Sequence, residues 1–235
     1  MMKAKVLRAN VALAAIAGAC ILAIGIGCDE KEDTLRSNAV TIVHDFGAND
    51  PNLYVAFGDS ITHDGQEGAS PSYPERLSLL LGHTVVNEGV GGERSAGGRN
   101  RVDSVLKQYK PGYLLIIYGA NDVFHMRPIA ETIDNLRAIV ECAKDNRTIP
   151  VLATTLPILV DGHEEWTQTV AALNQQIRVL AAQENVLLVD LEEVFETNPD
   201  TLLRPDGVHP SYAGNDAIAK VFYDVLLNPL ARRSR

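Results

Sequence analysis

Four short segments of this chain carry residue types that together could hydrolyse an ester. A serine hydroxyl is a weak nucleophile unless a base takes its proton and nearby donors stabilise the oxyanion. The segments supply a serine, a pair of glycines, an asparagine amide, and a histidine with an aspartate three residues before it. They are Gly58-Asp59-Ser60, Gly91-Gly92, Gly119-Ala120-Asn121-Asp122 and Asp206-Gly207-Val208-His209. This combination of groups is typical of a serine hydrolase.

Ser60 and His209 are the candidate nucleophile and base. Taken alone, a Gly-Asp-Ser triplet would suit a turn or a helix cap equally well. Pro210 disfavours helical geometry at His209, and Gly207 allows a sharp turn between Asp206 and His209. That turn would let the carboxylate hold one ring nitrogen while the other faces Ser60. The alternative is an acidic loop that leads into a Pro-initiated helix.

The second and third segments offer donors for an oxyanion. Glycine lets a backbone N–H approach a ligand closely, which suits Gly91-Gly92 to this role. Asn121 offers a neutral amide at the end of a predicted strand, or alternatively a turn or helix cap. We expect Asp122 to brace the turn that carries Asn121.

Several other kinds of site are excluded by what the motifs lack. Gly89-Val90-Gly91 would need a glycine at position 94 to complete a dinucleotide fingerprint, and Arg94 is there. No Gly-Lys-Ser/Thr follows the glycines. The histidines are scattered, and no His-x-x-x-His or cysteine pair has metal-ligand spacing. Gly-x-Ser-x-Gly, the elbow of the α/β-hydrolases, is absent from the sequence.

The elements that must position these residues alternate between strands and helices. Five short runs rich in Val, Ile, Leu and Tyr are mostly apolar throughout, as expected for parallel strands covered on both faces. The loops that follow such strands converge on one crevice, where ligands bind. The predicted strands are Leu53–Phe57, Thr84–Asn87, Tyr113–Tyr118, Ile149–Thr155 and Val186–Asp190.

Apolar stripes with helical spacing lie between the predicted strands and after the last one. Each stripe lines one helix face that can pack on the sheet. The sequence therefore predicts a three-layer α/β/α domain with a five-stranded parallel sheet, for which we expect the strand order 2-1-3-4-5. The stripes run over residues 102–109, 129–143 and 166–180 and over a final helix at about 211–227.

The N-terminus has the pattern of an export signal. Three basic residues precede an apolar run, and Ile26-Gly27-Cys28 is followed by acidic residues. This boundary resembles a bacterial lipoprotein processing site, with Cys28 as the lipidated residue. An uncleaved membrane anchor and plain secretion are the alternatives. We expect a signal or anchor over residues 1–28, a polar tether over 29–51, the folded domain over 52–228 and a basic tail over 229–235.

Charge narrows the choice of partners. Without residues 1–27 the chain carries 18 basic and 30 acidic side chains, a formal charge of −12. Such a surface repels phosphate polyanions, so nucleic acid is not an expected partner.

We expect the protein to lie at the bacterial cell envelope, lipid-anchored and facing the periplasm or the exterior. The oligomeric state stays open.

The four segments, in this order, resemble the SGNH or GDSL-type hydrolase family over about residues 52–228. The resemblance implies a flavodoxin-like SGNH fold and ester hydrolysis without a cofactor or metal. Within the family, the compact chain looks most like lysophospholipase and thioesterase I-like esterases. Small carbohydrate acetylesterases share the same segments. A binding module that keeps the fold without catalysis is an alternative of another class.

The same resemblance implies a role for each matching residue. Ser60 would be the nucleophile and would also donate its N–H to the oxyanion. Gly92 and Asn121 would be the second and third oxyanion donors. Asp206 and His209 would complete the triad. Ile61 stands where the family motif usually has leucine, which leaves the chemistry unchanged. The substrate would be a small acyl ester. From its place after the fourth predicted strand, we expect the loop Pro157–Glu165 to wall the acyl pocket, with Ile158, Leu159 and Val160 either lining the pocket or packing under the loop.

Overall fold

The computed structural model describes residues 44–63 and 71–227, and all structural statements below concern these residues. The predicted signal or anchor with Cys28, most of the predicted tether and the basic tail lie outside them. Among the helices that are described, none has both the length and the apolar character needed to cross a bilayer.

Five parallel strands form one sheet in the order β2-β1-β3-β4-β5. This confirms the predicted strand order. The strand residues at the centre of the sheet are fully buried, because helices cover both faces and leave no position for a polar side chain. The strands are β1 (Asp50–Gly58), β2 (Val85–Gly89), β3 (Pro111–Ile117), β4 (Ile149–Ala153) and β5 (Leu187–Val189).

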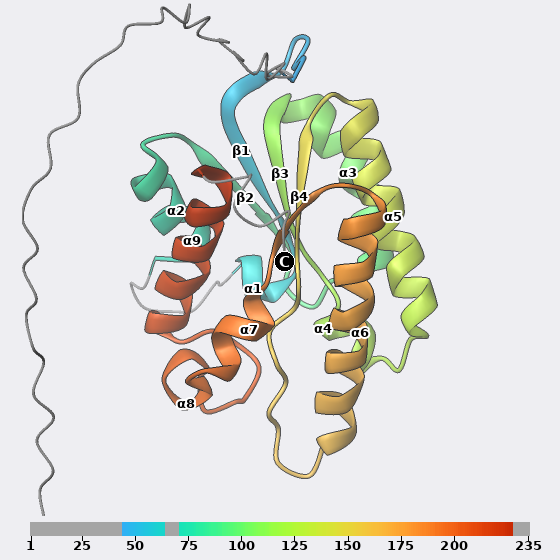
Figure 1. The fold of residues 1–235 in the computed structure, drawn as a ribbon, viewed down its shortest axis with the longest axis vertical. Helices are drawn as coiled ribbons and strands as arrows, with labels where there is room; N and C mark the ends of the chain where they lie inside the picture. Colours follow the sequence, from blue (N-terminus) through green and yellow to red (C-terminus); the bar gives the residue numbers. More distant parts are fainter. Residues whose placement is uncertain (1–43, 64–70, 228–235) are drawn as a thin grey trace, which may run out of the picture. The chain divides into compact units, whose positions relative to one another are not determined.

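Helices cover both faces of the sheet and complete the three-layer α/β/α fold, as predicted (Figure 1). On one face α2 (Tyr73–Leu81) packs against α9 (Tyr212–Leu227). On the other face α3 (Ser95–Tyr109), α5 (Ile129–Asp145) and α6 (Glu164–Gln183) lie side by side. The shorter helices are α1 (Ser60–His63), α4 (Ala120–Phe124), α7 (Leu191–Glu196) and α8 (Pro199–Leu202).

The four predicted stripes correspond to α3, α5, α6 and α9, whose buried residues include most stripe positions. Five helices were not predicted. Four of them are too short to show a helical period. In α2 the period is obscured, because Arg76 is buried beside Leu77 whereas Leu79 and Leu80 are exposed.

The folded unit begins earlier than predicted. Residues 44–51, which the sequence suggested were tether, pack on the turn that precedes β4. The Asn49 amide donates to the Asn146 carbonyl at 2.7 Å, and Asp45 pairs with Arg147. Asp50 is already part of β1 and is in register with Pro111. These residues look like tether in sequence because they are polar, yet their polar groups bind backbone and side chains about 100 residues away.

The carboxyl ends of β1, β2 and β3 lead into the first three of the four segments, and α9 follows the fourth. Parallel pairing brings these strand ends to one edge of the sheet, since Gly58 is in register with both Gly89 and Ile117. The fold thus carries the candidate residues to the same edge.

Candidate active site

Ser60 is the first residue of α1, which turns sharply out of the sheet after β1. Glycines permit this turn. A Cβ on Gly58 would lie 2.2 Å from Thr62 Oγ1, and a Cβ on Gly89 would lie 2.2 Å from the backbone nitrogen of His63. Neither contact is possible for a real side chain, so α1 can lie this close to the ends of β1 and β2 only with glycine at both positions.

Ser60, His209 and Asp206 lie within hydrogen-bonding distance in the order that proton transfer requires. His209 Nε2 is 3.0 Å from Ser60 Oγ, although the two residues are 149 positions apart in the chain. His209 Nδ1 is 2.9 Å from Asp206 Oδ2. Ser60 can therefore pass its proton to an imidazole whose other nitrogen is held by a carboxylate.

The Asp206 carboxylate is oriented by its own loop. Its Oδ1 accepts hydrogen bonds from the backbone N–H groups of Val208 and His209, both at 2.9 Å, which leaves Oδ2 for the imidazole. Burial alone raises the pKa of Asp206, but these backbone bonds and the His209 ring outweigh it, so the pKa lies below its usual value. The carboxylate is consequently ionised at neutral pH and can stabilise an imidazolium.

Gly207 closes this loop onto the segment after β4. It has φ of +69°, and a Cβ there would lie 2.0 Å from the Leu159 carbonyl oxygen. The Leu159 N–H in turn donates to the Gly207 carbonyl at 2.8 Å. The position of Asp206 and His209 therefore depends on a residue without a side chain between them.

We expect Gly207→Ala to lower the free energy of unfolding by about 2 kcal/mol or more, from the left-handed backbone and the overlap together. By displacing the loop it should also lower kcat at least about tenfold. Urea unfolding and ester hydrolysis measure the two effects. Gly162→Ala is the matched control, because Gly162 has φ of +76° but open space around its Cβ position. Equal losses in the two variants would contradict the role assigned to the Leu159 contact.

The two other expected oxyanion donors, Gly92 and Asn121, lie on segments that are hydrogen-bonded to Gly58 and Asp59, just before Ser60. Gly92, with φ of +75°, is in the turn after β2, and that turn is fastened to β1 by a bond from the Val90 N–H to the Gly58 carbonyl at 2.9 Å. Within the described part of the chain the Gly92 N–H donates no hydrogen bond. Asn121 Nδ2 donates to Asp59 Oδ2 at 3.3 Å and to the Glu93 carbonyl at 3.2 Å.

Asp59 is a further site residue whose role the sequence did not reveal. Its side chain is fully buried, with Oδ1 accepting from the Ile61 N–H at 3.0 Å and Oδ2 facing the Asn121 amide. Burial raises the pKa of Asp59 to about 7, against the lowering effect of these two hydrogen bonds, and the charge of Asp122 raises it further. The signal in the sequence was a carboxylate directly after an apolar strand.

The raised pKa of Asp59 makes a stability prediction of known sign. In the unfolded chain Asp titrates near 4, so the native state holds this proton more tightly. The stabilisation is complete below about pH 4 and is lost as the pH rises to about 7. Relative to Asp59→Asn, we expect the wild-type free energy of unfolding to fall by on the order of 4 kcal/mol across this window. Urea unfolding of both proteins from pH 4 to 8 tests this, and a pH-independent difference would contradict it.

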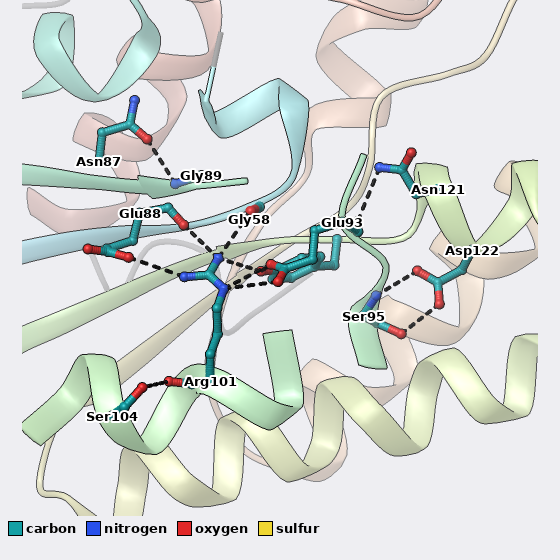
Figure 2. A network of polar contacts seen from close by, with 11 residues as sticks. Gly58, Asn87, Glu88, Gly89, Glu93, Ser95, Arg101, Ser104, Asn121 and Asp122 are labelled. Atoms are coloured by element: carbon teal, nitrogen blue, oxygen red, sulfur yellow. Dashed lines mark hydrogen bonds and ion pairs between the residues drawn. The ribbon is translucent and has the colours of Figure 1, made fainter. Parts of the chain in front are cut away.

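The Asp122 carboxylate binds the start of α3, whereas the sequence suggested that it would brace its own turn. Its carboxylate accepts from the Ser95 backbone N–H at 2.9 Å and from Ser95 Oγ at 2.7 Å, and thereby ties α4 to the start of α3. Figure 2 shows this pair beside a second cluster, in which the Arg101 guanidinium lies between Glu88 and Glu93. The sequence offered no sign of this cluster, since Glu88 lies on β2, Glu93 in the following turn and Arg101 on α3.

The loop Pro157–Glu165, predicted to wall an acyl pocket, follows β4 and runs into the first two residues of α6. Ile158 is buried in the core, Val160 is partly buried, and Leu159 is 43% exposed. Of the three candidate lining residues, only Leu159 thus offers a substantially exposed apolar side chain. Met126, in the segment after α4, is 87% exposed. No group of three metal-ligating side chains occurs among the described residues.

Comparison with known proteins supplies an independent line of evidence. Residues 56–217 match the model of the GDSL-like Lipase/Acylhydrolase family. An acetylxylan esterase from Geobacillus stearothermophilus is 28% identical over 166 residues, which cover 64% of this chain and 73% of that protein. The thioesterase 1/protease 1/lysophospholipase L1 of Escherichia coli K12 is 26% identical over 178 residues, which cover 74% and 83% of the two chains.

The fold is also found in solved structures. The crystal structure of Axe2, an acetylxylan esterase from Geobacillus stearothermophilus, superimposes with a TM-score of 0.66 at 24% identity. The superposition covers 75% of this chain and 94% of that one. At this level of identity, the similarity establishes a shared fold.

Proposed function

This chain belongs to the GDSL-like lipase/acylhydrolase family of ester hydrolases, and from that premise we propose that Ser60, His209 and Asp206 perform its hydrolytic reaction. The observation that carries the proposal is the continuous pair of contacts from Ser60 Oγ to His209 Nε2 and from His209 Nδ1 to Asp206 Oδ2. A structural histidine would not need a serine on one nitrogen and an ionised carboxylate on the other at the edge of the sheet where ligands bind.

The proposed reaction has two acyl-transfer steps. Ser60 Oγ attacks the ester carbonyl carbon while His209 Nε2 takes the hydroxyl proton, and Asp206 stabilises the resulting imidazolium. The tetrahedral intermediate collapses, His209 protonates the leaving alcohol, and an acyl-serine remains. Water then attacks this acyl-enzyme with His209 again as base, which releases the carboxylic acid and regenerates Ser60.

We propose that the oxyanion is held by the N–H groups of Ser60 and Gly92 and by the Asn121 amide. The Gly92 N–H is open for this role. Both Asn121 contacts, at 3.2 and 3.3 Å, are longer than the usual 2.9–3.0 Å for N–H···O bonds. The longer one, to Asp59, can therefore be exchanged for a bond to the oxyanion at little cost while the bond to the Glu93 carbonyl is kept. A charged oxyanion accepts a stronger hydrogen bond than a neutral acceptor does.

The proposed substrate is a lysophospholipid, a thioester or another small acyl ester. Leu159 and Met126, exposed on segments that lead away from β4 and α4, are suited to contact an acyl group. Carbohydrate O-acetyl esters are the second candidate, favoured by the similarity to an acetylxylan esterase. Turnover of nitrophenyl esters of increasing acyl length, run beside acetylated xylooligosaccharides, separates them. A sharp preference for the acetylated sugars would refute the lipid-ester proposal.

A non-catalytic binding module on the same fold is the competing proposal from another class. Serine hydrolases react covalently with fluorophosphonate probes, because the activated serine attacks phosphorus as it attacks a carbonyl carbon. We expect such a probe to label the wild-type protein and not Ser60→Ala. Absence of labelling in the folded wild-type protein would favour the binding module.

We propose that the protein acts at the bacterial cell envelope and is anchored through a lipid on Cys28, with secretion as the alternative. The support is the apolar run that ends at Ile26-Gly27-Cys28 and the acidic segment after it. Metabolic incorporation of a clickable fatty acid into wild-type protein, and its loss in Cys28→Ser, tests this anchor. Equal incorporation into both proteins would refute it.

A further inference from the structure

The two glycines of the turn after β2 have no side chains whose packing could hold the Gly92 N–H in place. Gly91 and Gly92 are exposed, and a Cβ at either position would meet nothing within 4 Å. A donor N–H that must meet an oxyanion within a few tenths of an ångström needs a fixed backbone. The position of the turn must therefore be set from its two ends. At the first end, the Val90 N–H is fastened to the Gly58 carbonyl.

Glu93 fastens the second end, the residue directly after Gly92. Its carbonyl accepts from Asn121 Nδ2 at 3.2 Å, which joins the second and third proposed donors. Its carboxylate accepts from Arg101 Nε at 2.9 Å and from the Tyr118 hydroxyl at 2.5 Å. Burial and the Glu93 hydrogen bond both raise the pKa of Tyr118, so the hydroxyl keeps the proton that it donates. The Glu93 side chain is only 14% exposed, so water screens its ion pair with Arg101 less than it would screen a pair at the surface.

Arg101 connects this residue to the strand ends. Its Nη2 donates to the Glu88 carbonyl at 2.7 Å and to the Gly58 carbonyl at 3.4 Å, and its Nη1 pairs with Glu88 Oε2 at 3.2 Å. The guanidinium also stacks on the Phe57 ring at 4.1 Å. Figure 2 shows one planar cation that reaches the end of β1, the end of β2 and the turn together.

We propose that Arg101 and Glu93 are positioning residues that hold the Gly92 N–H, and through the Glu93 carbonyl the Asn121 amide, in the oxyanion site. The proposal rests on the proposed function. Neither side chain touches the reacting atoms. Their contribution is the fixed geometry of two donors that act most strongly in the transition state.

Glu93→Gln and Arg101→Lys test the pair with little change in size. A misplacement of about 1 Å can cost about a hundredfold in rate, so we expect kcat for nitrophenyl acetate to fall about 10- to 100-fold in each variant. KM should stay within about twofold, because these donors bind the transition state and not the ground state. The double variant should be little worse than the more impaired single variant, since each change removes the same contact between Arg101 and Glu93.

Glu88→Gln and Lys107→Met are the matched controls. Glu88 pairs with the opposite side of the same guanidinium but lies on β2, before the turn. Lys107 lies on the same helix as Arg101 and makes an exposed pair with Asp103. Both controls should keep kcat within about threefold of wild type. A merely structural network would instead lower kcat and thermal stability alike in Glu88→Gln and Glu93→Gln.

Two outcomes would overturn the assignment and are distinguishable. Ser60-dependent turnover that is unchanged in folded Glu93→Gln would overturn the positioning role and leave the proposed function intact. Wild-type turnover equal to that of Ser60→Ala would refute the proposed function and this inference together. Should Arg101→Lys fail to fold by circular dichroism, the comparison of Glu93→Gln with Glu88→Gln still decides.

Discussion

Ser60→Ala should lower kcat for ester hydrolysis about a millionfold, the cost of removing one member of the proposed triad, which acts as a unit. Alanine removes the Oγ that lies 3.0 Å from His209 Nε2, so no covalent acyl intermediate can form. Residual turnover of about 10³–10⁴ over the uncatalysed rate should persist, because the proposed oxyanion donors remain. Steady-state kinetics and a pre-steady-state burst of nitrophenol, present in wild type and lost in the variant, measure this.

The matched control is Ser78→Ala, which removes a serine on α2 that bonds to the His83 carbonyl. It should keep kcat near the wild-type value and change stability by about 1 kcal/mol. Ser60→Ala itself should remain folded, since only one hydroxyl is lost. Ester turnover that survives at wild-type rate in purified, folded Ser60→Ala protein would remove the nucleophile assignment.

Asp206→Asn should lower kcat about 10⁴-fold at neutral pH, by a mechanism that the loop geometry determines. The backbone N–H groups of Val208 and His209 require an acceptor at the Oδ1 position. The amide oxygen of asparagine will occupy that position, which places the NH₂ group against His209 Nδ1. The ring must then accept at Nδ1 and carry its proton on Nε2, where it cannot take the proton of Ser60.

Asp200→Asn is the control for Asp206→Asn. Asp200 is an exposed carboxylate on α8, close in sequence to the loop, and should be nearly silent. The dependence of kcat on pH separates the effect of the His209 tautomer from the effect of losing the Asp206 charge. Raising the pH should partly restore Asp206→Asn if hydroxide can take over the role of the base, and the control should show no such recovery. An activity loss under tenfold in Asp206→Asn would contradict its role in holding the imidazole.

The strands and the longer helices could be predicted because their signals are local. A strand covered on both faces needs apolar residues throughout, as in the run Ile149–Thr155. A helix that packs on the sheet needs an apolar stripe on one face, as in α5. The observed element boundaries differ from the predicted ones where polar residues bind partners far away in the sequence. β1 starts at Asp50, and not at Leu53, because the segment before it bonds to residues 146–148. Short helices such as α1 and α8 lack a period and could not be seen.

The sequence by itself determined the chemical groups at the site. A hydroxyl after a strand, a histidine three residues from an aspartate and glycines at turns are properties of a few adjacent residues. It could not show that Asp59 is buried against Asn121, or that Arg101 spans two strand ends and a turn. Those facts depend on the parallel register that sets Gly58 beside Gly89 and Ile117.

What only the tertiary structure decided is which of many similar polar residues meet. The chain has six histidines and 30 acidic residues, and nothing local to Glu93 or Arg101 sets them apart. A charge placed inside a fold costs several kcal/mol unless partners surround it, and those partners come from elements far apart in sequence. Distances between such groups arise only when the whole sheet has formed, because its register and the helices that cover it place all of them at once.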